Sequence, residues 1–204
     1  MSDRVIAYID GFNLYFGLKT KGWKRFFWLD LGLLAANLLK PGQQLSAARY
    51  FTARISGPPD KQQRQKVFLE ANAALGRCRM YFGQYQDEPY QCRKCGATHM
   101  VHHEKMTDVN IAVHLFEDAL LDAFDTALLV SADSDLVPPV AKVRELFPRQ
   151  RVVVAFPAGR FSKELATVAH GYFTIGRRKY EKSLLPPEVT KPDGVVLRPL
   201  PSWR

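Results

Sequence analysis

Residues 130–135 are Val130-Ser131-Ala132-Asp133-Ser134-Asp135, and they place two carboxylates two residues apart. An apolar run at 127–130 precedes the pair, and a segment with helical periodicity follows at 136–146. The pair therefore lies where a buried strand should end and a helix should begin. Carboxylates at such a turn indicate a metal site. The alternative is that Asp133 only caps the helix that follows.

Strand-like and helix-like segments alternate around this stretch. Strands are expected at 4–9, 45–55, 78–85, 125–130, 151–156 and 172–175. Helices are expected from Asn13 and at 29–39, 60–75, 107–120, 136–147 and 162–169. In the helix at 107–120 we expect Thr107 as the N-cap and a helical face formed by Val109, Ala112, Val113, Phe116 and Leu120. The alternation predicts an α/β fold with a mostly parallel central sheet and helices on both faces.

The chain is expected to form one domain over residues 1–180. Residues 86–103 interrupt the alternation and are interpreted as an insertion, and residues 181–204, rich in proline and basic residues, as a C-terminal tail. Three cysteines without a secretory signal favour a reducing, cytoplasmic compartment over a disulfide framework. No apolar run reaches the ~20 residues that span a bilayer, so a membrane protein is not expected.

The net charge of +9 and the pI of about 9.6 favour a polyanionic partner, nucleic acid before an anionic membrane. One basic segment is interleaved with aromatic residues. It contains Lys19, Lys21, Lys24 and Arg25 together with Trp23, Phe26, Phe27 and Trp28. Such a segment is typical of a track that holds phosphates and stacks bases. The alternative is that several of these rings belong to the core.

Further polar residues are expected at the same edge of the sheet. The first and fourth strands are natural neighbours where the strand order reverses, so Asp10, at the end of the first strand, should lie beside Asp133. Asp108 lies in the first turn of the helix that leads into the fourth strand, and Asn13 follows Asp10 by three residues. Converging carboxylates repel one another unless a cation is present. Mg²⁺ and Mn²⁺ take oxygen ligands and can activate water next to a phosphate.

Three blocks of the sequence resemble those of a known family. They are residues 8–15 (YIDGFNLY), 104–113 (EKMTDVNIAV) and 129–136 (LVSADSDL). The blocks are similar to the NYN domain family of the PIN-like ribonuclease superfamily, in particular to its LabA-like branch. The resemblance implies a PIN-like Rossmannoid three-layer fold and a metal-dependent ribonuclease that leaves 5′-phosphate and 3′-hydroxyl ends. It places the site on Asp10, Asn13, Asp108, Asp133 and Asp135, with Asp10, Asp108 and Asp133 around Mg²⁺ or Mn²⁺.

The chain departs from the family's pattern at two positions. Ala132 stands where relatives commonly have glycine, and His170 stands where they often have an acid. We interpret His170 as a packed surface histidine and not as a replacement for that acid. Glu104, at the start of the second block, either takes part in catalysis or is a solvated partner of Lys105.

The segment 86–103 contains a second candidate metal site. Cys92 and Cys95 have the spacing of a zinc knuckle, and Gly96 allows the tight turn between them. A structural Zn²⁺ needs four ligands, and His99 or His102 could complete the set, with His103 and Cys78 as further candidates. The alternatives are a reduced turn with two free thiols and a degenerate knuckle that has lost its metal.

The sequence therefore predicts a metal-dependent ribonuclease, in the first place an endoribonuclease, that acts on single-stranded or structured RNA. The alternative is a catalytically weak regulator that binds RNA or protein with the same fold. A phosphatase is disfavoured, because no Asp-x-Asp-x-Thr pattern follows the first strand. The protein is compatible with a homo-oligomer.

Overall fold

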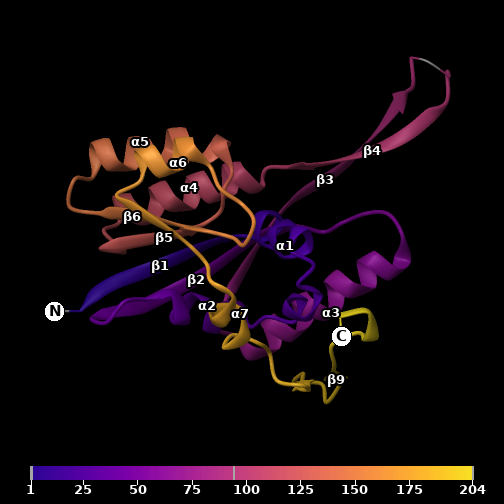
Figure 1. Ribbon diagram of the computed structural model, residues 1–204, viewed down its shortest axis with the longest axis horizontal. Coiled ribbons are helices and arrows are strands. Elements are labelled where there is room, and N and C mark those ends of the chain that lie inside the picture. The colour runs from indigo at the N-terminus through magenta and orange to yellow at the C-terminus, as the bar shows by residue number, and fades with distance from the viewer. Residues whose placement is uncertain (1, 94, 204) are drawn as a thin grey trace.

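The computed structural model of the chain describes residues 2–93 and 95–203, without the side chains of residues 85–89 and 99–105. Its centre is a seven-stranded sheet with the strand order β4-β3-β2-β1-β5-β6-β7 (Figure 1). The strands are β1 (Asp3–Asp10), β2 (Gln43–Ala53), β3 (Arg79–Gln91), β4 (Thr98–Lys105), β5 (Thr126–Val130), β6 (Arg151–Phe156) and β7 (Gly171–Thr174). Six of these strands are mutually parallel, and β4 runs antiparallel to β3.

Strand β1 lies at the centre of the sheet, where the strand order reverses. Its residues from Val5 to Ile9 are buried, because both faces of the sheet are covered. β1 pairs with β5 in parallel, with Ile9 opposite Val130. The expected adjacency of the first strand and the strand at 125–130 is therefore confirmed, and Asp10 and Ser131 leave the sheet at the same edge.

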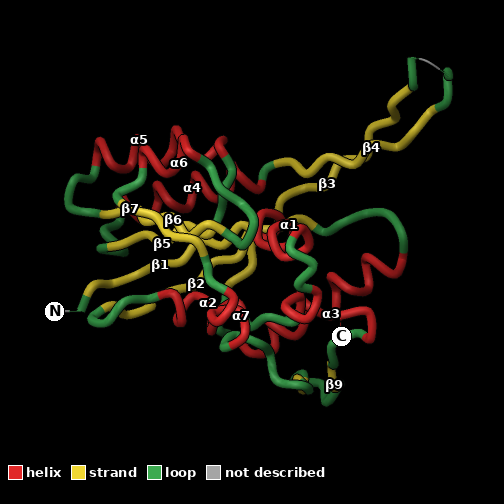
Figure 2. Tube along the Cα trace, in the orientation of Figure 1, coloured by secondary structure: helices red, strands yellow, loops and turns green. Residues whose placement is uncertain are grey.

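Helices cover both faces of the sheet and give three layers, as the alternation predicts (Figure 2). One face carries α1 (Gly11–Thr20), α2 (Leu31–Leu38), α3 (Pro59–Leu75) and α7 (Arg177–Glu181), with the short 3₁₀ turn η1 (Lys24–Phe27). The other carries α4 (Thr107–Leu120), α5 (Val137–Leu146) and α6 (Lys163–Val168). Successive residues of β1 contribute to the two cores in turn, because side chains alternate across a strand.

The apolar face expected for α4 is wrong, because several of its residues are exposed and other residues of the helix are buried. Val109, Val113 and Leu120 are 59%, 57% and 74% exposed, whereas the buried positions are Thr107, Ile111, Leu115, Asp118 and Ala119. Relative to the expected orientation, α4 is rotated about its axis so that Asp118 faces the sheet, where it makes buried polar contacts. Thr107 is not the N-cap either. Met106 occupies that position with φ of 77°, and the buried Thr107 hydroxyl has no hydrogen-bond partner among the described residues.

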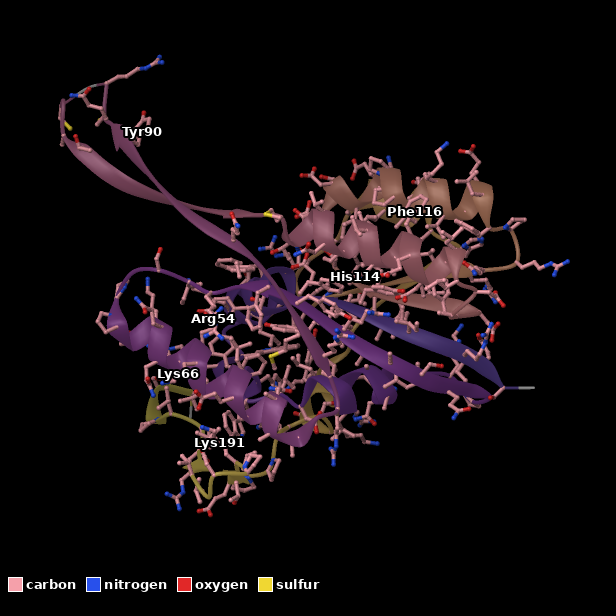
Figure 3. The ribbon with its side chains drawn as sticks, turned by 180° about the vertical axis from the view of Figure 1, so that it is seen from behind. Arg54, Lys66, Tyr90, His114, Phe116 and Lys191 are labelled. Atoms are coloured by element: carbon pink, nitrogen blue, oxygen red, sulfur yellow. The ribbon has the colours of Figure 1, made fainter. Side chains whose placement is uncertain are left out.

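Residues 86–103 form most of a two-stranded arm that projects from the body (Figure 1). The strand expected at 78–85 continues to Gln91, and β4 returns beside it with Gln91 opposite Thr98. Tyr90 lies near the far end of this arm, well away from the sheet (Figure 3). The alternation of strands and helices breaks here for two reasons. The arm has few apolar residues, and its antiparallel strands need no helical crossover of the kind that connects parallel strands.

The C-terminal segment packs against the body of the protein. It forms the small ladder β8 (Val189–Thr190) and β9 (Val196–Leu197) and ends in η3 (Pro201–Trp203). Trp203 is buried against Trp28, with ring centroids 6.0 Å apart. Together with residues of α3, these rings form a third hydrophobic cluster. The division at residue 180 remains a prediction.

Candidate metal centre and its surroundings

Asp10 ends β1 and caps α1, and three hydrogen bonds fix its carboxylate. Its Oδ1 accepts from the backbone N–H of Asn13 at 3.0 Å. Its Oδ2 accepts from Asn13 Nδ2 at 2.7 Å and from Ser131 Oγ at 2.8 Å. The residue is 2% exposed. Asn13 therefore orients Asp10, and its own Oδ1 is a buried acceptor without a hydrogen-bond partner among the described residues.

Ser131 joins the two strand ends, a role that was not predicted from the sequence. Its buried hydroxyl donates to Asp10 and accepts from the backbone N–H of Asp133 at 3.0 Å. One side chain thus sets the spacing between two acidic residues on adjacent strands. The sequence feature that could have indicated this role is the position of Ser131 directly after β5, opposite the end of β1.

Asp133 both caps the turn that follows it and belongs to the acidic cluster. It caps the 3₁₀ turn η2 (Ser134–Leu136), because its Oδ1 accepts from the backbone N–H of Asp135 at 3.1 Å. It also lies beside Asp10 and Asp108, and one carboxylate oxygen from each of the three residues lies within 4.8 Å of the other two. Asp135 is exposed at the rim and does not belong to this group.

Burial and repulsion between carboxylates raise the pKa values of Asp10 and Asp108. The pKa of Asp10 is raised mainly by burial, against the hydrogen bonds from Asn13 and Ser131. Burial raises the pKa of Asp108 to about 6, and repulsion from Asp10, Asp133 and Asp135 adds to the effect. None of these acids has a basic partner among the described residues. Their repulsion is therefore uncompensated by the chain itself.

The donor set fits a hard divalent cation. The three carboxylate oxygens lie within 4.8 Å of one another, a spacing that one cation with ligands at about 2.0–2.6 Å can bridge. The unpartnered Asn13 Oδ1 provides a further oxygen at the same edge for the ion or a water bound to it. Oxygen donors alone favour Mg²⁺ or Mn²⁺ over softer ions.

His170 takes no part in this cluster. It precedes β7 near the opposite edge of the sheet, where its Nδ1 accepts from the backbone N–H of Val152 at 3.0 Å. Burial, followed by repulsion from Arg144 and Arg151, lowers its pKa. The interpretation of His170 as a packed histidine is confirmed. The side chain of Glu104 lies outside the described residues.

Two backbone hydrogen bonds join the residues on either side of position 94, near the end of the arm. Cys92 N–H donates to Ala97 O at 2.8 Å, and Gly96 N–H, with φ of 71°, donates to Cys92 O at 2.9 Å. Cys92 is half-buried and Cys95 is exposed. The proposed nitrogen ligands, on His99 and His102, lie outside the described residues, as does His103. A zinc ion here remains a prediction. Cys78 is buried directly before β3.

The basic and aromatic segment at 19–28 is divided between core and surface. Phe26 and Trp28 are buried, which confirms the alternative that some of these rings are core. The exposed rings are instead Tyr15 and Phe16 on α1, which are 41% and 39% exposed. Lys19 Nζ lies over both rings, 6.0 Å and 5.6 Å from their centroids.

A cavity of about 500 Å³ opens between α1 and α3, beside the acidic cluster. It begins at Gly11 and Phe12, which directly follow Asp10. Gly11 permits the close approach of α1 to β2, since a Cβ at this position would lie 2.5 Å from the Tyr50 hydroxyl. Aromatic rings and basic side chains line most of the cavity.

The model of the NYN domain family matches residues 4–176 of this chain. The chain belongs to the NYN domain family. Members of this family are typically ribonucleases, and the acidic cluster of this NYN domain is consistent with a metal site. The resemblance of the three sequence blocks is therefore confirmed, as is the expected α/β fold.

Two similar proteins show how far the likeness extends. The 6-hydroxy-3-succinoylpyridine 3-monooxygenase HspA of Pseudomonas putida (strain DSM 28022 / S16) is 28% identical over 178 residues, which cover 69% of this chain and 55% of HspA. The NYN chain thus spans about half the length of this curated relative. A crystal structure of a protein of unknown function from Vibrio parahaemolyticus matches 90% of the chain and 97% of its own, with a TM-score of 0.54 and 18% identity. This second likeness shows the fold alone.

Within the described part of the chain, no helix combines the length and the apolar character needed to cross a bilayer.

Proposed function

We propose that this NYN domain is a metal-dependent endoribonuclease that hydrolyses RNA phosphodiester bonds. The observation that carries the proposal is the meeting of Asp10, Asp108 and Asp133 within 4.8 Å at the carboxyl edge of the sheet, with no basic partner among the described residues. Uncompensated carboxylates raise one another's pKa and destabilise the site until a cation binds. The arrangement is therefore suited to bind a cation.

Each residue of the centre has a role in this proposal. Asp10, Asp108 and Asp133 would hold Mg²⁺ or Mn²⁺, which neutralises charge on the phosphoryl oxygens and makes water a better nucleophile when bound. Asn13 and Ser131 hold Asp10 in place through the hydrogen bonds described above. The exposed Asp135 can accept a hydrogen bond from a water molecule in line with the scissile bond. Hydrolysis would leave 5′-phosphate and 3′-hydroxyl ends.

A second candidate function is the oxygenation of an aromatic acid. HspA is named as a monooxygenase of a succinoylpyridine, and the aromatic cavity beside Asp10 in this chain carries basic residues that suit a carboxylate. Such a reaction would consume dioxygen and a two-electron reductant, place a hydroxyl group on the ring and release one water. Oxygen uptake with a reduced nicotinamide and a hydroxypyridine acid would distinguish this function from RNA hydrolysis.

An RNA cleavage assay tests the first candidate. Purified protein is incubated with end-labelled RNA in Mn²⁺ or in EDTA, beside Asp133→Asn and a control, Asp122→Asn. Asp122 is exposed and has φ of 49°, a conformation that asparagine adopts readily. We expect cleavage in Mn²⁺ by the wild type and the control, and at least a ~100-fold loss in Asp133→Asn. Cleavage that survives EDTA, or that is unchanged in Asp133→Asn, would contradict the proposal.

A further inference from the structure

The cavity between α1 and α3 has a charge opposite to that of the acidic cluster. Its rim includes Lys19, Lys24, Lys61 and Arg64, and no acidic residue lines it among the described side chains. Arg64 is paired with Asp60, but Lys24 and Lys61 have no carboxylate partner in the described part of the chain. A cation-binding edge and a basic cavity therefore adjoin at Gly11. A strand of phosphodiesters can occupy both at once, because its charge complements a bound metal and the basic rim.

The walls of the cavity provide surfaces for a flat ring. Tyr15 is 41% exposed and lies 5.0 Å from Phe27, and Phe12 stacks on Phe16 with centroids 6.3 Å apart. Inside, Tyr50 and Phe68 meet edge to face at 6.1 Å. Exposed aromatic rings next to cations are the combination that stacks bases and holds their phosphates in single-strand binding proteins.

Thr52 brings a polar group to the wall of the cavity. Thr52 is 2% exposed as a residue and lines the cavity. The neighbouring Gln65 is held by the backbone, since its Oε1 accepts from the N–H of Ile55 and its Nε2 donates to Ala53 O. A threonine hydroxyl can both donate and accept a hydrogen bond, so it can pair with either kind of polar group on a ligand. Thr52 is therefore placed to contact the edge of a base.

From these observations we infer that the cavity is a nucleotide subsite, which binds one base of the substrate strand next to the scissile phosphate. Tyr15 stacks on the base or its neighbour, Thr52 contacts a base edge, and Lys24 and Lys61 hold phosphates. The inference rests on the proposed ribonuclease function and adds a ligand class to it: a planar heteroaromatic ring that carries an anionic group. The volume of about 500 Å³ lies within the range of small-molecule sites.

Binding measured without metal tests the subsite independently of catalysis. The anisotropy of a labelled hexaribonucleotide is titrated in EDTA with wild type, Tyr15→Ala, Thr52→Val and Lys61→Ala. Tyr172→Ala is the control, since Tyr172 is 55% exposed on β7 at the far edge of the sheet. We expect Tyr15→Ala to weaken binding by about 5- to 150-fold and Lys61→Ala to reduce the salt slope by about 0.7. Thr52→Val should reduce the discrimination between bases, and the control should bind as the wild type does.

A cleavage experiment with the same variants separates this inference from the proposed function. The same variants are assayed in Mn²⁺ with RNA and with bis(p-nitrophenyl) phosphate, a diester without a base. Tyr15→Ala should lose RNA cleavage mainly through KM and retain hydrolysis of the small diester, whereas Asp133→Asn should lose both. If Tyr15→Ala and Lys61→Ala bind and cleave RNA as the wild type does, the subsite is refuted and the nuclease stands. If the wild type cleaves neither substrate, the nuclease is refuted and the anisotropy series still decides the subsite.

A competition experiment shows whether the cavity binds a nucleotide base or the ring of a small aromatic acid. Nucleoside 5′-monophosphates and 4-hydroxybenzoate are each tested for displacement of the labelled RNA. Displacement by nucleotides, lost in Tyr15→Ala, supports the subsite. Displacement by the aromatic acid alone overturns it in favour of a small-molecule site.

Discussion

Helix α4 carries two aspartates that face the sheet, one near each end, and the protein treats them in opposite ways. Asp118 is 3% exposed and accepts from Tyr8 Oη at 2.5 Å and from Arg49 at 2.5 Å. Arg49 also donates to the Tyr81 hydroxyl, and the ring centroids of Tyr81 and of His114 on α4 lie 4.2 Å apart. Asp108, at the other end, has carboxylates for neighbours and no cation among the described residues.

The comparison shows which of the two carboxylates is structural. A buried charge is tolerated when the chain supplies its counter-charge and its hydrogen bonds, and Asp118 has both. Asp108 has neither, so its charge has to be balanced from outside the chain or removed by a proton. Charge compensation by the protein marks the first site as part of the fold, and its absence marks the second as a place for a cation.

The largest expected effect comes from removing the internal counter-charge. Arg49→Met should destabilise the protein by about 3–5 kcal/mol, because it leaves Asp118 buried and unpaired. Urea unfolding measures this change. The double variant Arg49→Met/Asp118→Leu should recover most of the loss, and Arg54→Met, an exposed arginine just beyond β2, should stay within about 0.5 kcal/mol of the wild type. A cost below about 1 kcal/mol for Arg49→Met would show that the pair is not structural.

Removing the uncompensated charge of Asp108 should raise the free energy of unfolding, whereas removing Arg49 should lower it. Asp108→Asn should stabilise the metal-free protein by about 1–3 kcal/mol at neutral pH, while it abolishes RNA cleavage. The folded-state pKa of Asp108 is raised to about 6 from an ordinary value of 3.8. The folded protein therefore binds more protons than the unfolded chain between these values, and wild-type stability should fall as the pH rises through this window.

Urea unfolding of both proteins between pH 4.5 and 7 measures the difference. The fall should be smaller in Asp108→Asn, which lacks the titrating group. An equal pH dependence in the two proteins would assign the effect to other residues.

A bound cation should give a smaller stabilisation. Mn²⁺ at about ten times its Kd adds about 1.4 kcal/mol, or about 3–5 °C in Tm for a domain of this size. Differential scanning fluorimetry should show this shift in the wild type and in Asp122→Asn, but not in Asp133→Asn. The shift should weaken below pH 6, where Asp108 gains a proton. A shift that persists in Asp133→Asn would place the ion elsewhere.

The smallest effect is expected at the tip of the arm, where two thiols would also need an external cation. Cys92→Ser should reduce the zinc content from about one to about zero per chain, and should change the unfolding free energy of the body by less than about 0.5 kcal/mol. Neither Cys92 nor Cys95 belongs to any of the three hydrophobic clusters, which explains the small effect. Metal analysis after dialysis decides the matter, and a zinc-free wild type would leave the alternative of a reduced turn.

The sequence was sufficient to predict the six parallel strands of the sheet and its central pair, but not the antiparallel strand β4. The runs at 4–9 and 151–156 are buried on both faces, so apolar residues are continuous and parallel strands can be recognised without knowledge of their neighbours. The point where the strand order reverses then follows from the fold class, and with it the proximity of Asp10 to Asp133.

The orientation of α4 could not be predicted in the same way. Its apolar residues lie on several faces, and the deciding contacts come from Tyr8 and Arg49, which are far away in the sequence. The role of Ser131 was hidden for a related reason, since its partner Asp10 lies 121 residues earlier. Local patterns predict elements, whereas pairings between distant polar side chains appear only in three dimensions.

The distance in sequence between Asp10 and Ser131 has a consequence for the synthesis of the protein. A chain is made from its N-terminus, and contacts between distant segments form late. A nascent chain that stops before β5 contains Asp10 and Asp108 but neither Ser131 nor Asp133. The third carboxylate joins the other two only after β5 has paired with β1. A chain that ends before β5 therefore lacks one wall of the candidate metal centre, and under the proposed function it would lack the means to cleave RNA.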